Sequence, residues 1–121
     1  MPKPRKQKIK SDEVPSDIRR RIVEDFGPKL ADRIYRYLLD RIPDGLPNGT
    51  RPRHLRCILY LAKGDRALLD RYIEMCLTDT RDVMFNAEYQ TDPNRRFMRL
   101  RDFNKPFGRS EIRRRKKGKR G

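Results

Sequence analysis

Apolar residues recur at helical spacing along the middle of the chain. Ile18, Ile22 and Phe26 follow one another at intervals of four, which places them on one face of a helix. Ser16 can cap the start of this helix, and Gly27, followed by a proline, ends it. The pattern therefore predicts a first helix between these two signals.

A second apolar stripe follows directly, and its members again lie four residues apart: Leu30, Ile34, Leu38 and Ile42. Pro43 ends this second helix, because proline cannot continue the hydrogen-bond pattern. The next stretch, residues 43–52, contains three prolines and two glycines and is therefore expected to be a loop.

Three further helices are predicted after this loop. One starts after Thr50 and runs to Gly64, the next is capped by Asp65, and a short one begins within residues 78–80. Their inward-facing side chains are predicted to be Leu55, Ile58, Leu59, Ala62, Leu69, Tyr72, Ile73, Cys76, Val83, Met84 and Ala87. No window shows sustained strict alternation and β-branched residues are few, so strands are not expected.

The pattern thus predicts an all-α fold, a small bundle of four to five short helices with basic, largely flexible arms. We divide the chain into a basic N-terminal arm (1–15), a helical core (16–89), an Arg/Phe-rich segment (90–109) and a flexible basic tail (110–121). Packing of residues 90–109 against the core, like a clasp, is one of three interpretations of that segment. A core of this size buries only roughly 60% of its unfolded surface, so added contacts would stabilise it.

Charge adds the first functional signal, because it is distributed unevenly. The 121-residue chain has 32 Lys+Arg and 17 Asp+Glu, a formal net charge of +15. The final stretch, residues 90–121, holds thirteen basic and three acidic residues, a net +10, whereas residues 16–89 carry only +2. Like charge that folding does not need is typical of a segment that binds an oppositely charged partner.

Nucleic acid is the partner that this charge favours, with RNA ahead of DNA. Lysine and arginine neutralise phosphates, and the dense basic run at residues 113–120 resembles the tails of ribosome-associated and nucleoid proteins. The predicted phosphate-binding residues are Arg95, Arg96, Arg99, Arg101, Lys105, Arg109, Arg113, Arg114, Arg115, Lys116, Lys117, Lys119 and Arg120.

Three phenylalanines stand among these basic residues: Phe97, Phe103 and Phe107, three of the chain's five. Their rings could be buried against the core, stack on unpaired bases, or dock on another protein. Disordered tails are usually poor in aromatic residues, and large rings gain free energy on burial. We therefore favour burial, for Phe97 and Phe103 before Phe107.

Candidate metal-binding and catalytic groups are few. His54, Cys57 and Cys76 could meet across two helices and bind zinc, but there is no fourth ligand at standard spacing, and free cysteine is commonly a small buried hydrophobe. The single histidine stands beside Arg53 and Arg56, whose charge should lower its pKa and keep it neutral.

Carboxylates are also available, as Asp79 and Asp82 with Glu88, or Asp65 with Asp70, but without any catalytic motif around them. The turn at Asp65 invites comparison with helix-turn-helix proteins, yet acidic residues on the exposed side of the following helix would repel phosphate. A packed αα-hairpin explains the same pattern. We therefore expect no enzyme, no cofactor and no bound metal.

Cellular location follows from weaker signals. The basic start has no apolar run behind it, and the two cysteines lack the spacing of disulfide scaffolds, which fits a reducing cytoplasm. The longest apolar run, residues 57–62, is too short to span a bilayer, and stable membrane association is not expected. The chain is thus predicted to be a cytoplasmic, non-enzymatic nucleic-acid-binding protein; the alternative is an adaptor that recognises a protein partner.

Overall fold

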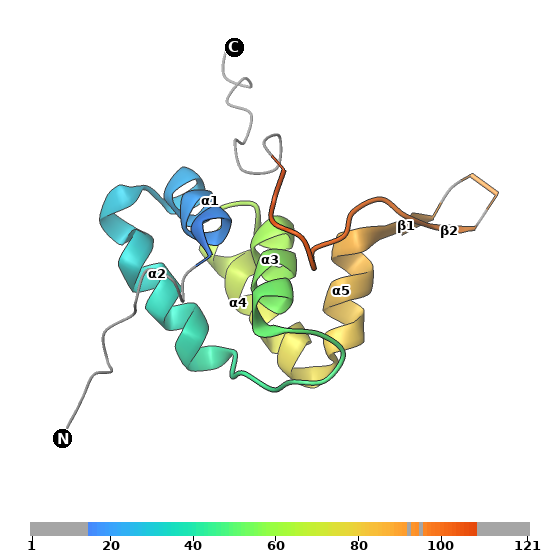
Figure 1. Cartoon of the computed structure of the whole chain (residues 1–121), viewed down its shortest axis with the longest axis horizontal. Helices are drawn as coiled ribbons and strands as arrows, with labels where there is room; N and C mark the ends of the chain where they lie inside the picture. Colours follow the sequence, from blue (N-terminus) through green and yellow to red (C-terminus); the bar gives the residue numbers. More distant parts are fainter. Residues whose placement is uncertain (1–14, 92, 95, 109–121) are drawn as a thin grey trace, which may run out of the picture.

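The computed structural model describes residues 15–91, 93–94 and 96–108, and the two basic ends lie outside these ranges. The described elements are α1 (Ser16–Phe26), α2 (Pro28–Arg41), α3 (Arg51–Ala62), α4 (Arg66–Thr78), α5 (Thr80–Glu88), β1 (Tyr89–Thr91) and β2 (Phe97–Arg99). Five helices make up most of the described chain, which confirms the predicted all-α bundle (Figure 1).

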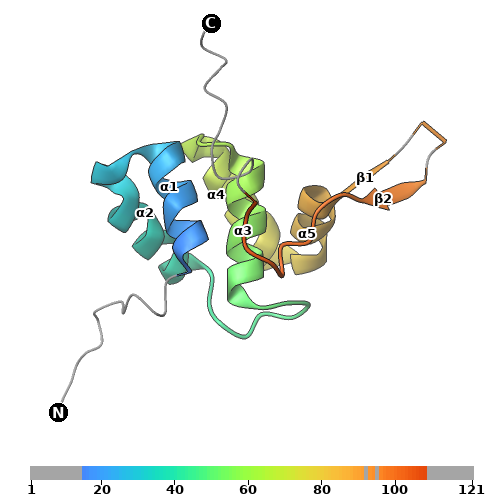
Figure 2. The same ribbon diagram turned by 45° about the horizontal axis from the view of Figure 1, so that its top comes forward.

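Helix α3 occupies the middle of the bundle. It contacts α1, α4 and α5, with α1 and α5 on opposite sides of it, while α2 packs against α1 (Figures 1 and 2). A single residue, Gly27, joins α1 to α2 with a φ of 90°, a conformation that favours glycine. This tight reversal holds the first two helices together as a hairpin.

The core is drawn from the apolar stripes of all five helices. Predicted inward positions such as Ile22, Leu38, Leu59 and Ile73 have no exposed surface. Leu30, however, is 40% exposed, because Ala31 takes the inward position in the first turn of α2. The apolar spacing therefore identified the buried faces of the helices, but its assignment of Leu30 at the start of α2 was wrong.

The helix starts follow the predicted caps, except at α1. The side chains of Thr50, Asp65 and Asp79 accept hydrogen bonds from backbone N–H groups in the first turns of α3, α4 and α5. Ser16 does not cap α1: it is the first residue of that helix, and Pro15 precedes it without a side-chain cap. Proline offers no side-chain acceptor, so α1 starts without this stabilisation.

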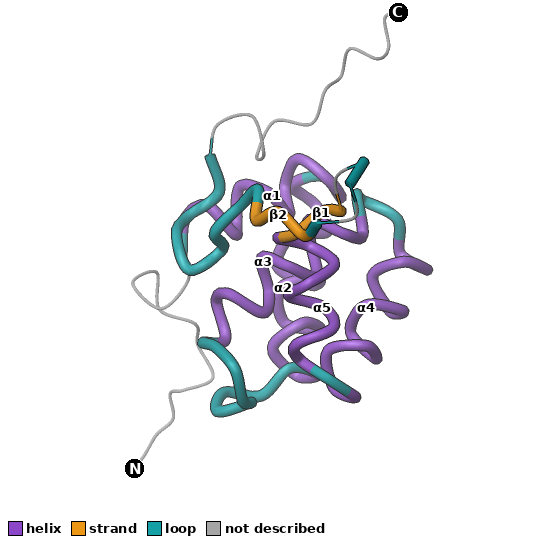
Figure 3. Tube along the Cα trace, turned by 90° about the vertical axis from the view of Figure 1, so that its right-hand side faces the viewer, coloured by secondary structure: helices purple, strands orange, loops and turns teal. Residues whose placement is uncertain are grey.

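A short hairpin follows α5, which contradicts the expectation that the chain has no strands. Residues of β1 and β2 pair antiparallel, with Tyr89 opposite Arg99 and Gln90 opposite Met98. The hairpin extends away from the helices (Figures 1 and 2). In Figure 3 it faces the viewer. Each strand has three residues, too few for an alternating pattern to be recognised in the sequence.

Replacing Leu59 by alanine tests the packing of the core. Leu59 has no exposed surface, so Leu59→Ala should lower the free energy of unfolding by roughly 2–5 kcal/mol, measured by urea denaturation. Leu77→Ala is the matched control, because Leu77 also lies on a helix but is 40% exposed, and it should cost less than about 1 kcal/mol. Equal effects of the two substitutions would contradict the observed packing.

Candidate functional site

The chain after β2 returns to the helices and passes over α3, between α1 and α5 (Figures 1 and 2). We call residues 100–107 the anchor segment. Its two rings, Phe103 and Phe107, are 1% and 5% exposed, and they meet at a centroid distance of 5.3 Å. Tyr60 of α3 lies 5.4 Å from the Phe103 ring. The anchor segment therefore contributes two large side chains to the core.

Glu88, the last residue of α5, holds the start of the anchor segment. Its side chain has no exposed surface and accepts two hydrogen bonds from Arg53, at 2.7 and 2.9 Å. The same carboxylate accepts from the backbone N–H of Phe103 at 3.1 Å and from Arg99 at 2.8 Å. The Glu88 carbonyl also accepts from the backbone N–H of Leu100 at 2.7 Å. One residue thus joins α3, α5, the hairpin and the anchor segment.

The charge state of Glu88 follows from these contacts. Burial alone would raise its pKa, but the hydrogen bonds from Arg53, from the Phe103 amide and from Arg99 hold the pKa below its ordinary value. The same contact with Glu88 raises the pKa of Arg53. The group is therefore a carboxylate at neutral pH, and its role is to bind donors within the protein.

A second carboxylate holds the end of the anchor segment. Asp17, in the first turn of α1, binds the Arg56 guanidinium through both oxygens, at 2.8 and 3.2 Å, and accepts from the backbone N–H of Phe107 at 3.0 Å. Arg56 also donates to the carbonyl of Phe103 at 3.0 Å. Because Asp17 and Arg56 are both buried, removing either would leave an uncompensated charge inside the protein.

Arg99 and Arg101, which were both predicted to bind phosphate, contact groups of the protein itself. Arg99 binds Glu88 and, at 3.0 Å, Asp102. Arg101 donates to the carbonyl of Ala87 at 2.9 Å, and its guanidinium lies 4.4 Å from the centre of the Tyr60 ring. These two arginines therefore help to hold the anchor segment in place.

Among the remaining predicted phosphate-binding residues, Arg96 and Lys105 are exposed, as Arg99 also is. The rest lie outside the described residues: Arg95, Arg109, Arg113, Arg114, Arg115, Lys116, Lys117, Lys119 and Arg120.

Phe97 does not join the other two phenylalanines, so the expectation that it would be buried is wrong. It lies in β2 and is 63% exposed, because the hairpin carries it away from the helices. It is the end of an aromatic group that we call the hairpin cluster, formed by Phe85, Tyr89 and Phe97. The Phe85 ring lies 5.2 Å from Tyr89, nearly parallel at 18°, and 4.8 Å from Phe97, edge to face at 79°.

Sequence reasoning singled out only one member of the hairpin cluster. Phe85 and Tyr89 are four residues apart at the end of a helix, a spacing that brings side chains together. The contact between Phe85 and Tyr89 could therefore have been predicted from the sequence. The hairpin that brings Phe97 to these two rings was not predicted. The buried roles of Asp17, Arg56 and Glu88 were missed for a similar reason, since each binds a partner from a distant part of the chain.

The candidate zinc ligands are all buried. Neither ring nitrogen of His54 makes a hydrogen bond of ordinary geometry. Burial and the charge of Arg53 lower the pKa of His54, in the predicted direction, and a weak contact with the backbone of Pro47 does not offset them. Burial raises the pKa of Cys57 and raises that of Cys76 to about 11. Within the ranges that the structure describes, no three His, Cys, Asp or Glu side chains converge as a metal site.

The candidate catalytic carboxylates have structural contacts instead of a shared site. Asp65 and Asp79 cap α4 and α5, Glu88 belongs to the buried network, and Asp70 accepts a hydrogen bond from the Tyr37 hydroxyl. Asp82 is an exposed residue in the first turn of α5. These side chains are therefore explained by the fold.

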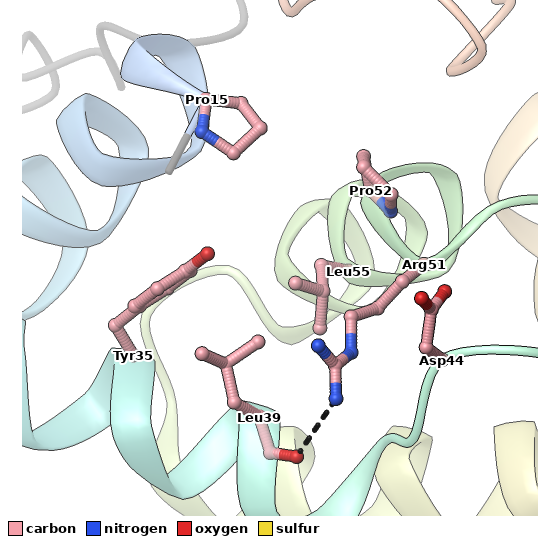
Figure 4. Close-up of a pocket in the computed structure, with 7 residues that line it drawn as sticks. All are labelled: Pro15, Tyr35, Leu39, Asp44, Arg51, Pro52 and Leu55. Atoms are coloured by element: carbon pink, nitrogen blue, oxygen red, sulfur yellow. Dashed lines mark hydrogen bonds between the residues drawn. The ribbon is translucent and has the colours of Figure 1, made fainter. Parts of the chain in front are cut away.

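A pocket of about 400 Å³ opens between the start of α1, the end of α2 and α3 (Figure 4). Its lining residues are Pro15, Tyr35, Leu39, Asp44, Arg51, Pro52 and Leu55. The Arg51 guanidinium donates to the backbone carbonyls of Ile42 at 2.9 Å and Leu39 at 3.4 Å, so it satisfies the end of α2. The positive charge of Arg51 is therefore already bound to backbone carbonyls. We assign no ligand to the pocket.

Comparison with protein-family models, with curated proteins and with solved structures found no match. The described helices include none with the length and apolar character needed to cross a membrane. The geometry of this chain is therefore the basis for its functional interpretation.

Replacing Glu88 by glutamine tests the buried network. Glu88→Gln keeps the shape of the side chain but leaves Arg53 and Arg99 without their shared counter-charge, so it should lower the free energy of unfolding by roughly 3–5 kcal/mol. Asp82→Asn is the control on the same helix and should cost less than about 1 kcal/mol. If urea denaturation gives the same stability for both variants, Glu88 does not hold the anchor segment.

The buried histidine predicts a pH dependence. Because the pKa of His54 is lowered from its ordinary value of 6.5, the unfolded chain binds more protons than the folded protein just below that pH. Stability should therefore fall as the pH drops from about 7 to about 5.5, where carboxylates with ordinary pKa values still stay ionised. His54→Leu should remove most of this dependence in thermal melts. A wild-type melting temperature that does not change over this range would contradict the assignment.

Proposed function

We propose that the protein binds nucleic acid, RNA more readily than DNA, without catalysing a reaction. The observation that carries this proposal is the charge of residues 90–121, which hold thirteen basic and only three acidic residues. One of those acids, Asp102, already pairs with Arg99. Acidic residues are thus outnumbered within this stretch of the sequence, and phosphates are the counter-charge that suits dense lysine and arginine.

The anchor segment supports this function by giving the basic tail a defined origin. Phe103 and Phe107 fix the chain to the core, and exposed Lys105 lies between them. Residues 113–120, with seven basic positions among eight, begin only a few residues after this attachment. In the sequence, this basic run therefore follows directly on a segment that is fixed to the core.

The contacts of α4 argue against sequence-specific reading of duplex DNA by this helix. In a helix-turn-helix protein the second helix must enter the major groove. Here Asp70 and Glu74 of α4 contact Tyr37 and Arg41 of α2, so part of the polar side of α4 faces another helix. These contacts leave α4 poorly suited to read a groove.

We place this activity in the cytoplasm. Cys57 and Cys76 are both buried free thiols, which is the state expected in a reducing compartment.

A protein adaptor is the second candidate function. Exposed apolar side chains on and after the hairpin, Phe97, Met98 and Leu100, favour it. The two functions differ in what the protein carries out of a cell lysate. A nucleic-acid-binding protein retains material that absorbs at 260 nm and is released by high salt, whereas an adaptor retains only protein.

The salt dependence of binding tests the proposed function. If about six phosphates are contacted, a plot of log affinity against log salt concentration should have a slope of roughly −4 to −5. Deleting residues 110–121 removes most of the tail charge and should make the slope shallower while the helical signal in circular dichroism is retained. A slope that the deletion does not change would place the phosphate contacts elsewhere.

A further inference from the structure

We propose that the hairpin cluster is a stacking platform for unpaired bases, and that the preferred ligand is therefore a single strand. This inference rests on the proposed function and specifies the ligand of the same protein. Its starting point is the exposure of Phe97, which leaves 63% of a large ring in solvent. Phe103 and Phe107, only a few residues later, are buried, so this part of the chain can place rings in the core. Exposed rings of this kind mark interaction sites.

The geometry holds the exposed ring ready for a ligand. Phe97 meets Phe85 edge to face at 4.8 Å, and Phe85, itself 41% exposed, lies almost parallel to Tyr89. The Arg99 guanidinium lies 6.0 Å from the Tyr89 ring and is itself bound to Glu88. The platform is therefore attached to the buried network, and an ordered ring loses less conformational entropy on binding.

Charge identifies the occupant. Arg99 lies on the same face of the hairpin as Phe97, Arg96 precedes Phe97 in the sequence and is exposed, and Lys105 of the anchor segment is exposed as well. In the described residues 96–108 the single acidic residue, Asp102, is paired with Arg99. Aromatic rings flanked by basic side chains are the arrangement that binds single strands, with the rings stacking on bases and the cations contacting the backbone. Paired bases inside a duplex do not offer their faces to such a ring.

The strand register supplies a matched control. Successive side chains on a strand point to opposite faces, so Phe97 and Arg99 share one face of the hairpin and Met98 lies on the other. Met98 is 45% exposed and adjacent in sequence. A contact made by the hairpin cluster should therefore depend on Phe97 and not on Met98.

The test measures the binding of wild-type protein and three variants to a labelled oligouridine of about 12 nucleotides and to an RNA duplex of the same length. Wild type should bind the single strand more tightly. Phe97→Ala should weaken binding to the single strand by roughly 5- to 150-fold and leave duplex binding and the salt slope unchanged. Phe97→Tyr should retain tight binding, and Met98→Ala should stay within about two-fold of wild type. Because Phe97 is exposed, its variants should melt at the wild-type temperature.

Three results would overturn the inference, and they are distinguishable. If Phe97→Ala and Met98→Ala bind the single strand equally well, the ring is not a contact, although steep salt dependence would still support the proposed function. If Phe97→Ala weakens single-strand and duplex binding alike, the ligand is not read through unpaired bases. If wild type binds neither probe, the proposed binding of RNA is itself wrong, and the stacking platform is wrong with it.

Discussion

The buried carboxylate of Glu88 is the interaction on which the rest of the structure depends. It binds Arg53 from the central helix, Arg99 from the hairpin and the amide of Phe103 from the anchor segment. A buried charge is costly unless donors surround it, so these three groups and the carboxylate require one another. The position of the hairpin relative to the helices is therefore set from inside the protein, by the last residue of α5.

The same arrangement divides the arginines into two functional groups. Arg53, Arg56 and Arg99 bind carboxylates within the fold, and their charge is largely offset there. Arg96 is exposed on the hairpin, and the basic run of residues 113–120 follows the anchor segment. Net charge cannot distinguish these groups, because an arginine has the same charge in either role. The contacts with carboxylates identify three arginines that stabilise the fold, and the proposed binding surface is the exposed part of the hairpin together with the tail.

The helices could be predicted from the sequence because their signals are local. Stripes such as Ile18 with Ile22 and caps such as Asp65 involve residues within one or two turns. The hairpin and the anchor segment could not, because three-residue strands carry no recognisable period and Asp17 meets Phe107 from the opposite end of the chain. The three phenylalanines illustrate the limit. Composition predicted that their rings make contacts, but only the fold separates Phe97, which the hairpin carries away from the helices, from Phe103, which packs against α3.

The proposed contact between the hairpin cluster and unpaired bases can be observed by NMR, with oligouridine added to the isotope-labelled full chain. If the proposal is right, the ring resonances of Phe97 and Phe85 and the amides of β1 and β2 shift on binding. The ring of Phe103 should change little, since it is buried against α3. Shifts confined to α1 and α2, with the hairpin resonances unchanged, would contradict it.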